Sequence, residues 1–216
     1  MTRADGAPAE LPVRGAVVGL LLAAGSGSRY GGPKALVEWD GELLVHRAAR
    51  LLREGGCERV VLVVGAQAQR VSAAAGLPDV VVATDWSTGM GASLRAGLAG
   101  LPASAGACVV SLVDQPLLGS AAVVRLREAW TAGAVAAVAT YDGRPRNPVL
   151  LDRAVWAEVA ALAQGDSGAR TWLRTHADLV TSVPCDDTGS PVDVDTPADL
   201  AALTCPTDPA LRRLPA

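Results

Sequence analysis

Short apolar runs rich in β-branched residues alternate with helix-like patterns along most of this chain. This alternation restricts the possible folds more than any other feature. The predicted strands span 17–23, 59–64, 80–83, 108–112, 135–141 and 179–183. The predicted helices span 43–54, 66–75, 91–100, 121–132, 154–162, 169–175 and 197–203. Because strands that alternate with helices form parallel sheets joined by right-handed crossovers, we predict a three-layer α/β fold with a Rossmann-like, doubly wound, mainly parallel sheet.

The length and the two end segments predict a single domain. The chain has 216 residues, 50% of them apolar, which suffices for one large core. Residues 1–14 and 204–216 are polar or contain several prolines. We therefore expect a disordered N-terminal segment, a domain at 15–203 and a flexible tail. The apolar run at 16–24 is about half as long as a membrane span, and we interpret it as a buried strand.

Charge and cysteine content narrow the possible partners. A net charge of −3 and an aromatic content of 3% argue against nucleic acid or an anionic membrane as a partner. The four cysteines show no CxxC spacing, which argues against a zinc site or a thioredoxin-like motif. They are Cys57, Cys108, Cys185 and Cys205. We expect free thiols and a cytoplasmic protein that acts on small molecules.

The loop after the first predicted strand holds the only lysine of the chain, Lys34, among 19 basic residues. The loop reads GSGSRYGGPK from Gly25 to Lys34. A glycine-rich turn exposes backbone N–H groups, which together with Arg29 and Lys34 would form a cradle for a polyphosphate. A surface loop is also a common place for a lysine, so this feature alone leaves both interpretations open.

Two familiar phosphate loops do not match these residues. A dinucleotide-binding loop has the spacing GxGxxG and an acidic residue after the second strand. Here the third glycine, Gly31, comes one residue too late, and 59–78 contains no Asp or Glu. A Walker A loop needs Gly before the lysine and Ser or Thr after it, whereas Lys34 lies between Pro33 and Ala35. A nicotinamide dehydrogenase and a P-loop enzyme are both disfavoured.

The loop instead resembles the LAAGxGxRxGxPKxL signature of the nucleotidyltransferase superfamily, and most closely that of the molybdenum cofactor cytidylyltransferases. Four later segments match the same family in the family's own order. They are GMxxSL at 89–94, DQP at 114–116, GDxGAR at 165–170 and DxDTPxDL at 193–200. The resemblance covers 17–203 and implies a fold of the nucleotide-diphospho-sugar transferase type.

The resemblance also implies a magnesium-dependent nucleotidyltransferase. In this reaction a phosphate monoester attacks the α-phosphorus of a nucleoside triphosphate and pyrophosphate leaves. CTP is the implied nucleotide, because Ala23-Ala24 is similar to the cytidylyl-type loop. A molybdopterin-type cofactor is the implied acceptor, with a molybdoenzyme as a possible client. Another phosphorylated sugar or cofactor precursor as acceptor, or a non-catalytic protein that binds and delivers the cofactor, stays open.

The family motifs imply specific residues for this chemistry. The implied catalytic residues are Arg29, Lys34 and Asp114. The implied nucleotide-binding residues are Leu22, Ala23, Ala24, Gly25, Ser26, Gly27, Ser28, Arg29, Lys34, Gly89, Ser93 and Asp114. Asp114 and Asp195 are the implied magnesium ligands, since this ion prefers carboxylate oxygens. Because ligands bind beyond the carboxyl ends of parallel strands, we expect the loop at 25–34 and Asp114 to lie at the same sheet edge.

Structural roles remain as alternatives for several of these residues. Asp114 and Ser93 could cap a turn or a helix. Asp195 precedes Thr196-Pro197 and could belong to a helix start. Five residues are candidates for binding the acceptor, although arginines in this region could also form a solvated surface loop. They are Arg144, Arg146, Asn147, Asp166 and Arg170, and Arg146-Asn147 stands where many family members have Gly-His.

Overall fold

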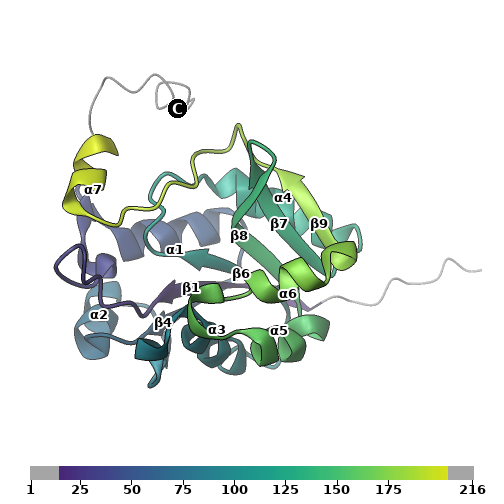
Figure 1. The fold of residues 1–216 in the computed structure, drawn as a ribbon, viewed down its shortest axis with the longest axis horizontal. Helices are drawn as coiled ribbons and strands as arrows, with labels where there is room; N and C mark the ends of the chain where they lie inside the picture. Colours follow the sequence, from purple (N-terminus) through teal and green to yellow (C-terminus); the bar gives the residue numbers. More distant parts are fainter. Residues whose placement is uncertain (1–14, 204–216) are drawn as a thin grey trace, which may run out of the picture.

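The computed structural model describes residues 15–203, so the expected disordered segment at 1–14 and the expected tail at 204–216 lie outside the described residues. The described part contains a seven-stranded sheet with the order β5-β4-β1-β6-β8-β7-β9 (Figure 1). Its strands are β1 (Ala16–Ala23), β4 (Arg59–Val64), β5 (Asp79–Val82), β6 (Ala105–Leu112), β7 (Ala136–Tyr141), β8 (Arg144–Asp152) and β9 (Val180–Pro184). Only β8 in this sheet is antiparallel to its neighbours. The prediction of a mainly parallel sheet is confirmed.

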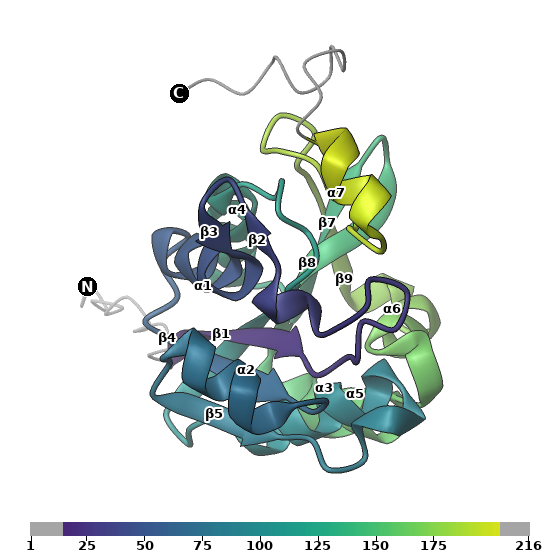
Figure 2. The same ribbon diagram turned by 90° about the vertical axis from the view of Figure 1, so that its left-hand side faces the viewer.

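Helices cover both faces of the sheet, which gives the predicted three layers (Figures 1 and 2). They are α1 (Leu44–Glu54), α2 (Ala68–Ala75), α3 (Met90–Ala99), α4 (Ser120–Thr131), α5 (Trp156–Leu162) and α6 (Arg170–Thr175). The apolar core on one face of the sheet includes residues of α1, α2 and α4. The core on the other face includes residues of α3, α5 and α6. A seventh helix, α7 (Pro197–Leu203), has no buried residue of its own.

The central strand β1 is apolar throughout because both of its faces are covered. Val17 and Leu21 pack in one core, whereas Leu20 and Leu22 pack in the other. Helix α3 approaches this strand closely, since a Cβ added at Gly97 would lie 2.8 Å from Leu20 Cδ1. This two-sided packing holds the end of β1, and therefore the loop that follows it, in a fixed place.

Three strands of the structure, β2, β3 and β8, were not predicted from the sequence. The hairpin of β2 (Glu38–Trp39) and β3 (Glu42–Leu43) is only two residues deep on each side. Strand β8 begins with Arg144, Pro145, Arg146 and Asn147, which do not look like an inner strand, and it is buried only at 148–151. The register of the β7–β8 pair shifts between Val138 and Ala139 of β7, and this shift accommodates the proline-containing half of β8.

The carboxyl ends of β1 and β6 lie next to each other, as expected. The two strands are parallel neighbours, with Leu22 opposite Leu112, and the Val113 N–H donates to the Leu22 carbonyl at 3.2 Å. The loops after both strands therefore start side by side at one edge of the sheet.

Two further observations concern the chain as a whole. Within 15–203, no helix has both the length and the apolar composition needed to cross a lipid bilayer. Three cysteines of this range are buried free thiols, namely Cys57, Cys108 and Cys185. Cys205 lies outside the described residues. Burial raises the pKa of Cys57 to about 12, so this thiol stays protonated at neutral pH.

Candidate active site

The loop after β1 folds around one carbonyl group. The N–H groups of Tyr30, Gly31 and Gly32 all donate to the Gly27 carbonyl, at 2.9, 2.9 and 3.1 Å. Gly27 has a positive φ of 60°, and a Cβ here would lie 1.9 Å from the Gly32 carbonyl oxygen, so no other residue type fits. In the described part of the chain, the N–H groups of residues 25–28 have no backbone partner. Such N–H groups remain available to an anion.

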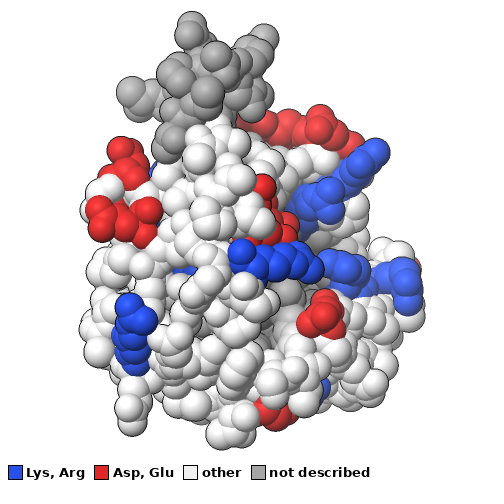
Figure 3. All heavy atoms as spheres, turned by 60° about the vertical axis from the view of Figure 1, so that its left-hand side comes forward, with Lys and Arg blue, Asp and Glu red and all other residues white. Residues whose placement is uncertain are grey.

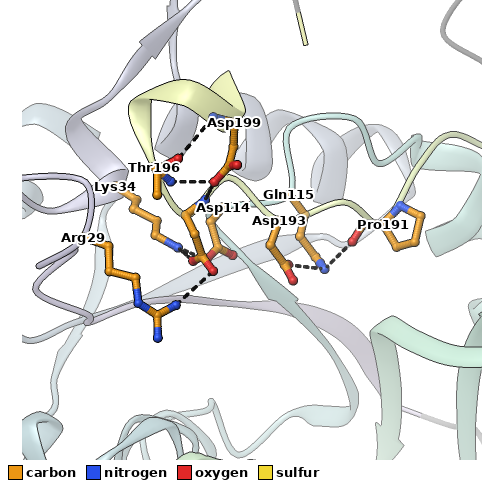
Figure 4. A network of polar contacts seen from close by, with 9 residues as sticks. Arg29, Lys34, Asp114, Gln115, Pro191, Asp193, Thr196 and Asp199 are labelled. Atoms are coloured by element: carbon orange, nitrogen blue, oxygen red, sulfur yellow. Dashed lines mark hydrogen bonds and ion pairs between the residues drawn. The ribbon is translucent and has the colours of Figure 1, made fainter. Parts of the chain in front are cut away.

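Lys34 lies between two of the predicted site carboxylates. Its Nζ donates to Asp114 Oδ2 at 2.7 Å and also contacts Asp195 Oδ1. Arg29 lies farther out and donates from Nη1 to Asp195 Oδ2 at 3.3 Å. Figure 4 shows the Lys34 side chain pointing toward Asp114 and the Arg29 side chain reaching toward the same cluster of carboxylates. Three charged groups form the centre of the site. Lys34 follows the loop after β1, Asp114 lies in the loop after β6, and Asp195 lies in the segment before α7.

Lys34 and the carboxylates beside it stabilise each other's charged forms. Burial alone would lower the pKa of Lys34, but its hydrogen bonds and charge interactions with Asp114 and Asp195 outweigh burial and raise the pKa. The bond from Lys34 in turn lowers the pKa of Asp195. Lys34 therefore stays an ammonium group and Asp195 a carboxylate at neutral pH. Burial, followed by repulsion from Asp114, raises the pKa of nearby Asp193.

Asp195 does lie at a helix start, because α7 begins at Pro197 and the Asp195 N–H donates to Asp199 Oδ2, but the side chains of Asp195, Asp114 and Ser93 cap nothing. Helix α7 is capped by Thr196, whose Oγ1 accepts from the Asp199 N–H, and by Asp199, whose Oδ2 accepts from the Thr196 N–H. The Asp195 carboxylate takes no part in this cap. Asp114 bonds Lys34 rather than a turn, and Ser93 lies inside α3, whose N-cap residue is Gly89. These side chains are free of capping roles.

The two carboxylates suit a divalent cation. Asp114 Oδ1 is buried and has no hydrogen-bond partner among the described residues, while Asp195 is 46% exposed. Within 15–203, no group of three His, Cys, Asp or Glu side chains is already arranged around a metal position. Magnesium commonly binds one or two carboxylates and takes its other ligands from phosphate and water. Asp114 and Asp195 fit that pattern.

All the predicted nucleotide and metal residues line one cavity of about 380 Å³. The loop after β1 forms one wall, and the segment at 86–93 forms another. In Figure 3, acidic side chains lie in a hollow of this face and basic side chains border it. Trp86, Ser87 and Met90 also line this cavity and were not among the predicted site residues. Met90 lies within the GMxxSL motif and Trp86 and Ser87 lie just before it, which was the available signal.

A second cavity of about 710 Å³ adjoins the first. Asp114, Asp195 and Met90 line both cavities, so the two spaces meet at the acidic pair. The second cavity has an aliphatic floor and a polar rim. Its floor includes Leu94, Val110, Val138 and Val149, each buried.

The structure separates the five candidates for acceptor binding. Arg146, Asn147 and Arg170 line the second cavity. Asp166 lines the first cavity instead, where its Oδ1 accepts from the Met90 N–H at 3.4 Å. Arg144 lines neither cavity, because it lies at the β7–β8 turn opposite Tyr141. Only the first three are placed to contact a molecule in the second cavity.

Comparison with known families gives a match over most of the chain. The family described as "MobA-like NTP transferase domain" matches residues 19–180. This range includes the loop after β1, Asp114 and both cavity walls, whereas Asp195 lies beyond it.

Two relatives with different names illustrate the similarity. The chain is 42% identical over 189 residues to a protein named nicotine blue oxidoreductase from Paenarthrobacter nicotinovorans, covering 83% of this chain and 92% of the relative. It is 37% identical over 129 residues to a probable molybdenum cofactor guanylyltransferase from Opitutus terrae, covering 59% of this chain and 62% of the relative.

Solved structures show the same fold. A crystal structure of a Mycobacterium tuberculosis H37Rv protein superposes with a TM-score of 0.77 at 30% identity, covering 88% of this chain and 98% of that one. A manganese complex from the same organism superposes with a TM-score of 0.67 at 27% identity, covering 92% and 97%.

Proposed function

This chain belongs to the MobA-like NTP transferase family, and from that premise we propose that it transfers CMP from CTP to the phosphate of a molybdopterin-type cofactor and releases pyrophosphate. The observation that carries the proposal is the meeting of two cavities at Asp114 and Asp195. A transfer between two substrates needs both held with their reacting atoms in contact. One cavity would hold the nucleotide, the other the acceptor.

The nucleotide side would work by positioning and charge. The triphosphate would lie along residues 25–28, whose N–H groups point to no backbone partner within the described residues. Arg29 and Lys34 would neutralise the β- and γ-phosphates and the charge that develops on pyrophosphate. Gly89 and Ser93 would bound the space for the nucleoside, with Trp86 beside them.

Lys34 would have to change partners during binding. Its Nζ donates to Asp114 and Asp195, which leaves one of its three N–H bonds for a triphosphate, and a cation bound by the same carboxylates would compete for their oxygens. A flexible lysine stem can make this move, whereas an arginine fork is less adaptable. We infer that nucleotide binding draws the ammonium onto the phosphates and leaves the acidic pair to a magnesium ion.

Asp114 and Asp195 are the residues that would hold the ion. A bound divalent cation would supply positive charge to the phosphate oxygens around the reacting phosphorus. The acceptor phosphate would need no general base, because its second pKa is about 6. This agrees with the absence of a histidine among the residues lining either cavity.

The second cavity has a composition that suits a ring-bearing phosphate. Its aliphatic floor can pack against the flat face of a pterin. Arg146 and Arg170 can bond the phosphate or the ring edge through their planar guanidinium groups. Another phosphorylated sugar or cofactor precursor of similar size remains the alternative acceptor.

An assay of pyrophosphate release tests this function. The protein is incubated with Mg²⁺, one of the four nucleoside triphosphates and molybdopterin-type cofactor, and pyrophosphate is measured. We expect release with CTP to exceed release with GTP, ATP or UTP. GTP is the main competitor, since a 37% identical relative is named a guanylyltransferase. No pyrophosphate with any triphosphate and any phosphorylated acceptor would refute the transferase function.

The relative named as an oxidoreductase, at 42% identity, supports a second candidate function. A nicotinamide-dependent reaction would need a carboxylate after the second parallel strand. Here β4 is followed by Gly65-Ala66, and the first acid after it, Asp79, bonds Arg59 at the opposite end of the strand pair. Oxidation of NADH or NADPH by the protein, measured by absorbance, would favour this candidate.

A non-catalytic role in delivering the cofactor to a molybdoenzyme makes a different prediction. Delivery alone would not need Lys34 beside the acidic pair. A Lys34→Ala variant that still activates a client enzyme fully, while releasing no pyrophosphate, would favour delivery over catalysis.

A further inference from the structure

The segment that carries Asp195 is attached along its length to the loop after β6. We call residues 190–195 the strap. Its Ser190 N–H donates to the Leu117 carbonyl at 2.9 Å, and its Val194 N–H donates to the Asp114 carbonyl at 2.8 Å. Just before the strap, Gly189 forms an antiparallel bridge with Leu118. The two backbones therefore run alongside each other, with a bond at each end of the strap.

The Gln115 side chain bonds the part of the strap that lies between these two backbone bonds. Its Nε2 donates to the Pro191 carbonyl at 3.2 Å and to Asp193 Oδ1 at 2.9 Å, so both amide hydrogens are used (Figure 4). Because both partners are oxygens, they fix which way the amide group faces. The side chain is buried, with 6% of its surface exposed.

The other end of the same amide has no partner. Gln115 Oε1 is buried and accepts no hydrogen bond from any described residue. A buried carbonyl oxygen without a partner is a cost to the fold. An apolar side chain of similar length would avoid this cost but would lose the two bonds that glutamine donates to the strap.

The strap is fixed on its other side by α7. The Asp195 and Thr196 N–H groups both donate to Asp199 Oδ2, at 3.0 and 2.7 Å. Asp195 thus lies between an anchor on the α7 side and an anchor at Gln115. It has 46% of its side chain exposed and packs little, so these anchors hold it opposite Asp114.

We propose that Gln115 is a positioning residue for the metal pair: it holds the strap so that Asp195 faces Asp114 across the cavity. Gln115 bonds neither Asp195 nor Lys34, so any effect on the pair would pass through the strap; it also lines the second cavity, which makes the KM for the acceptor a necessary readout. The proposal rests on the proposed function, since the pair must hold a cation together with a nucleotide. Groups that orient metal ligands typically change metal affinity or activity by 10- to 100-fold when they are removed.

The test uses Mn²⁺ with a non-hydrolysable CTP analogue. Gln115→Met keeps the side-chain length, removes both strap bonds and also removes the unpartnered oxygen. We expect Mn²⁺ to bind about 10-fold more weakly by electron paramagnetic resonance. The kcat for pyrophosphate release should fall by a similar factor, while the KM for CTP stays within about twofold and the melting temperature changes little. Gln69→Met, on the exposed face of α2, is the matched control and should behave as the unsubstituted protein.

A pair of substitutions that reverses the direction of the Gln115–Asp193 hydrogen bond provides a second test. Gln115→Glu places a carboxylate against Asp193 and the Pro191 carbonyl, so Mn²⁺ affinity should fall further than in Gln115→Met. Adding Asp193→Asn supplies an amide donor opposite that carboxylate and restores one strap bond with its direction reversed. We expect the double variant to recover most of the lost Mn²⁺ affinity. A side chain that only filled space would give no such recovery.

The outcomes separate this proposal from the proposed function. Unchanged Mn²⁺ affinity in Gln115→Met and Gln115→Glu, with an active unsubstituted protein, would overturn the positioning role alone. A raised KM for the acceptor with unchanged Mn²⁺ affinity would also overturn it, since Gln115 would then act on the acceptor. If the unsubstituted protein binds no Mn²⁺ with nucleotide and releases no pyrophosphate, both proposals fall.

Discussion

Replacing Asp114 by asparagine should lower kcat for pyrophosphate release by about 10²- to 10³-fold. Asp114 and Asp195 both line the two cavities, and Asp114 is the more buried of the pair, with 21% of its side chain exposed against 46%. Asparagine keeps the size of the side chain but removes the negative charge. It would therefore weaken the hold on a cation and the attraction of Lys34. Steady-state kinetics at saturating CTP and Mg²⁺ measures the loss.

The fold should survive this substitution. Asp114 Oδ1 already lacks a hydrogen-bond partner among the described residues, so loss of the charge relieves an unfavourable burial as well as breaking an ion pair. Asp178→Asn, on a segment that lines neither cavity, is the control and should retain full activity. An Asp114→Asn enzyme within threefold of normal kcat, with normal Mg²⁺ dependence, would contradict the metal role.

Replacing Lys34 by methionine should have an effect of similar size on rate and an opposite effect on metal binding. The rate should fall by about 10²- to 10³-fold, because the charge that would stabilise the leaving pyrophosphate is gone. Mn²⁺ affinity without nucleotide should rise by about tenfold, which corresponds to about 1.4 kcal/mol. The reason is that the ammonium between Asp114 and Asp195 no longer competes with the ion. Direct Mn²⁺ titration measures this second effect.

Two controls separate charge from shape. Lys34→Arg keeps a positive charge between the two acids, so Mn²⁺ binding without nucleotide should remain weak. The rate should still fall, because the planar guanidinium group cannot follow the phosphates as lysine does. Arg53→Met removes an exposed positive charge from α1 and should change neither quantity. If Mn²⁺ binds Lys34→Met no more tightly than the unsubstituted protein, the ammonium does not compete for the acidic pair.

The sequence predicted the parts of the fold that have strong periodic patterns. Strand β4 has the predicted ends, and β1 differs by one residue, because both are continuous apolar runs buried on two faces. Strand β8 was missed because its first half contains two prolines and two arginines. Its pairing with β6 and β7 is a property of the tertiary structure, which outweighs local propensity.

The site could be predicted only in part from the sequence, because local motifs mark residues but not the contacts between distant segments. The motifs marked the loop after β1, Asp114 and Asp195, and topology placed the first two at one sheet edge. The ion pairs of Lys34 with both acids join residues 80 and 161 positions apart, which no local pattern encodes. The strap bonds of Gln115 are equally distant in sequence, since they join residues 76 and 78 positions apart.

A crystal structure with Mn²⁺ and a non-hydrolysable CTP analogue tests the central claim most directly. Anomalous scattering locates the manganese independently of the protein atoms. We predict manganese coordinated by both Asp114 and Asp195, the triphosphate along residues 25–28, and Lys34 Nζ on a phosphate oxygen rather than between the acids. A nucleotide bound outside the first cavity, or manganese away from Asp114 with Lys34 still between the two carboxylates, would contradict the account.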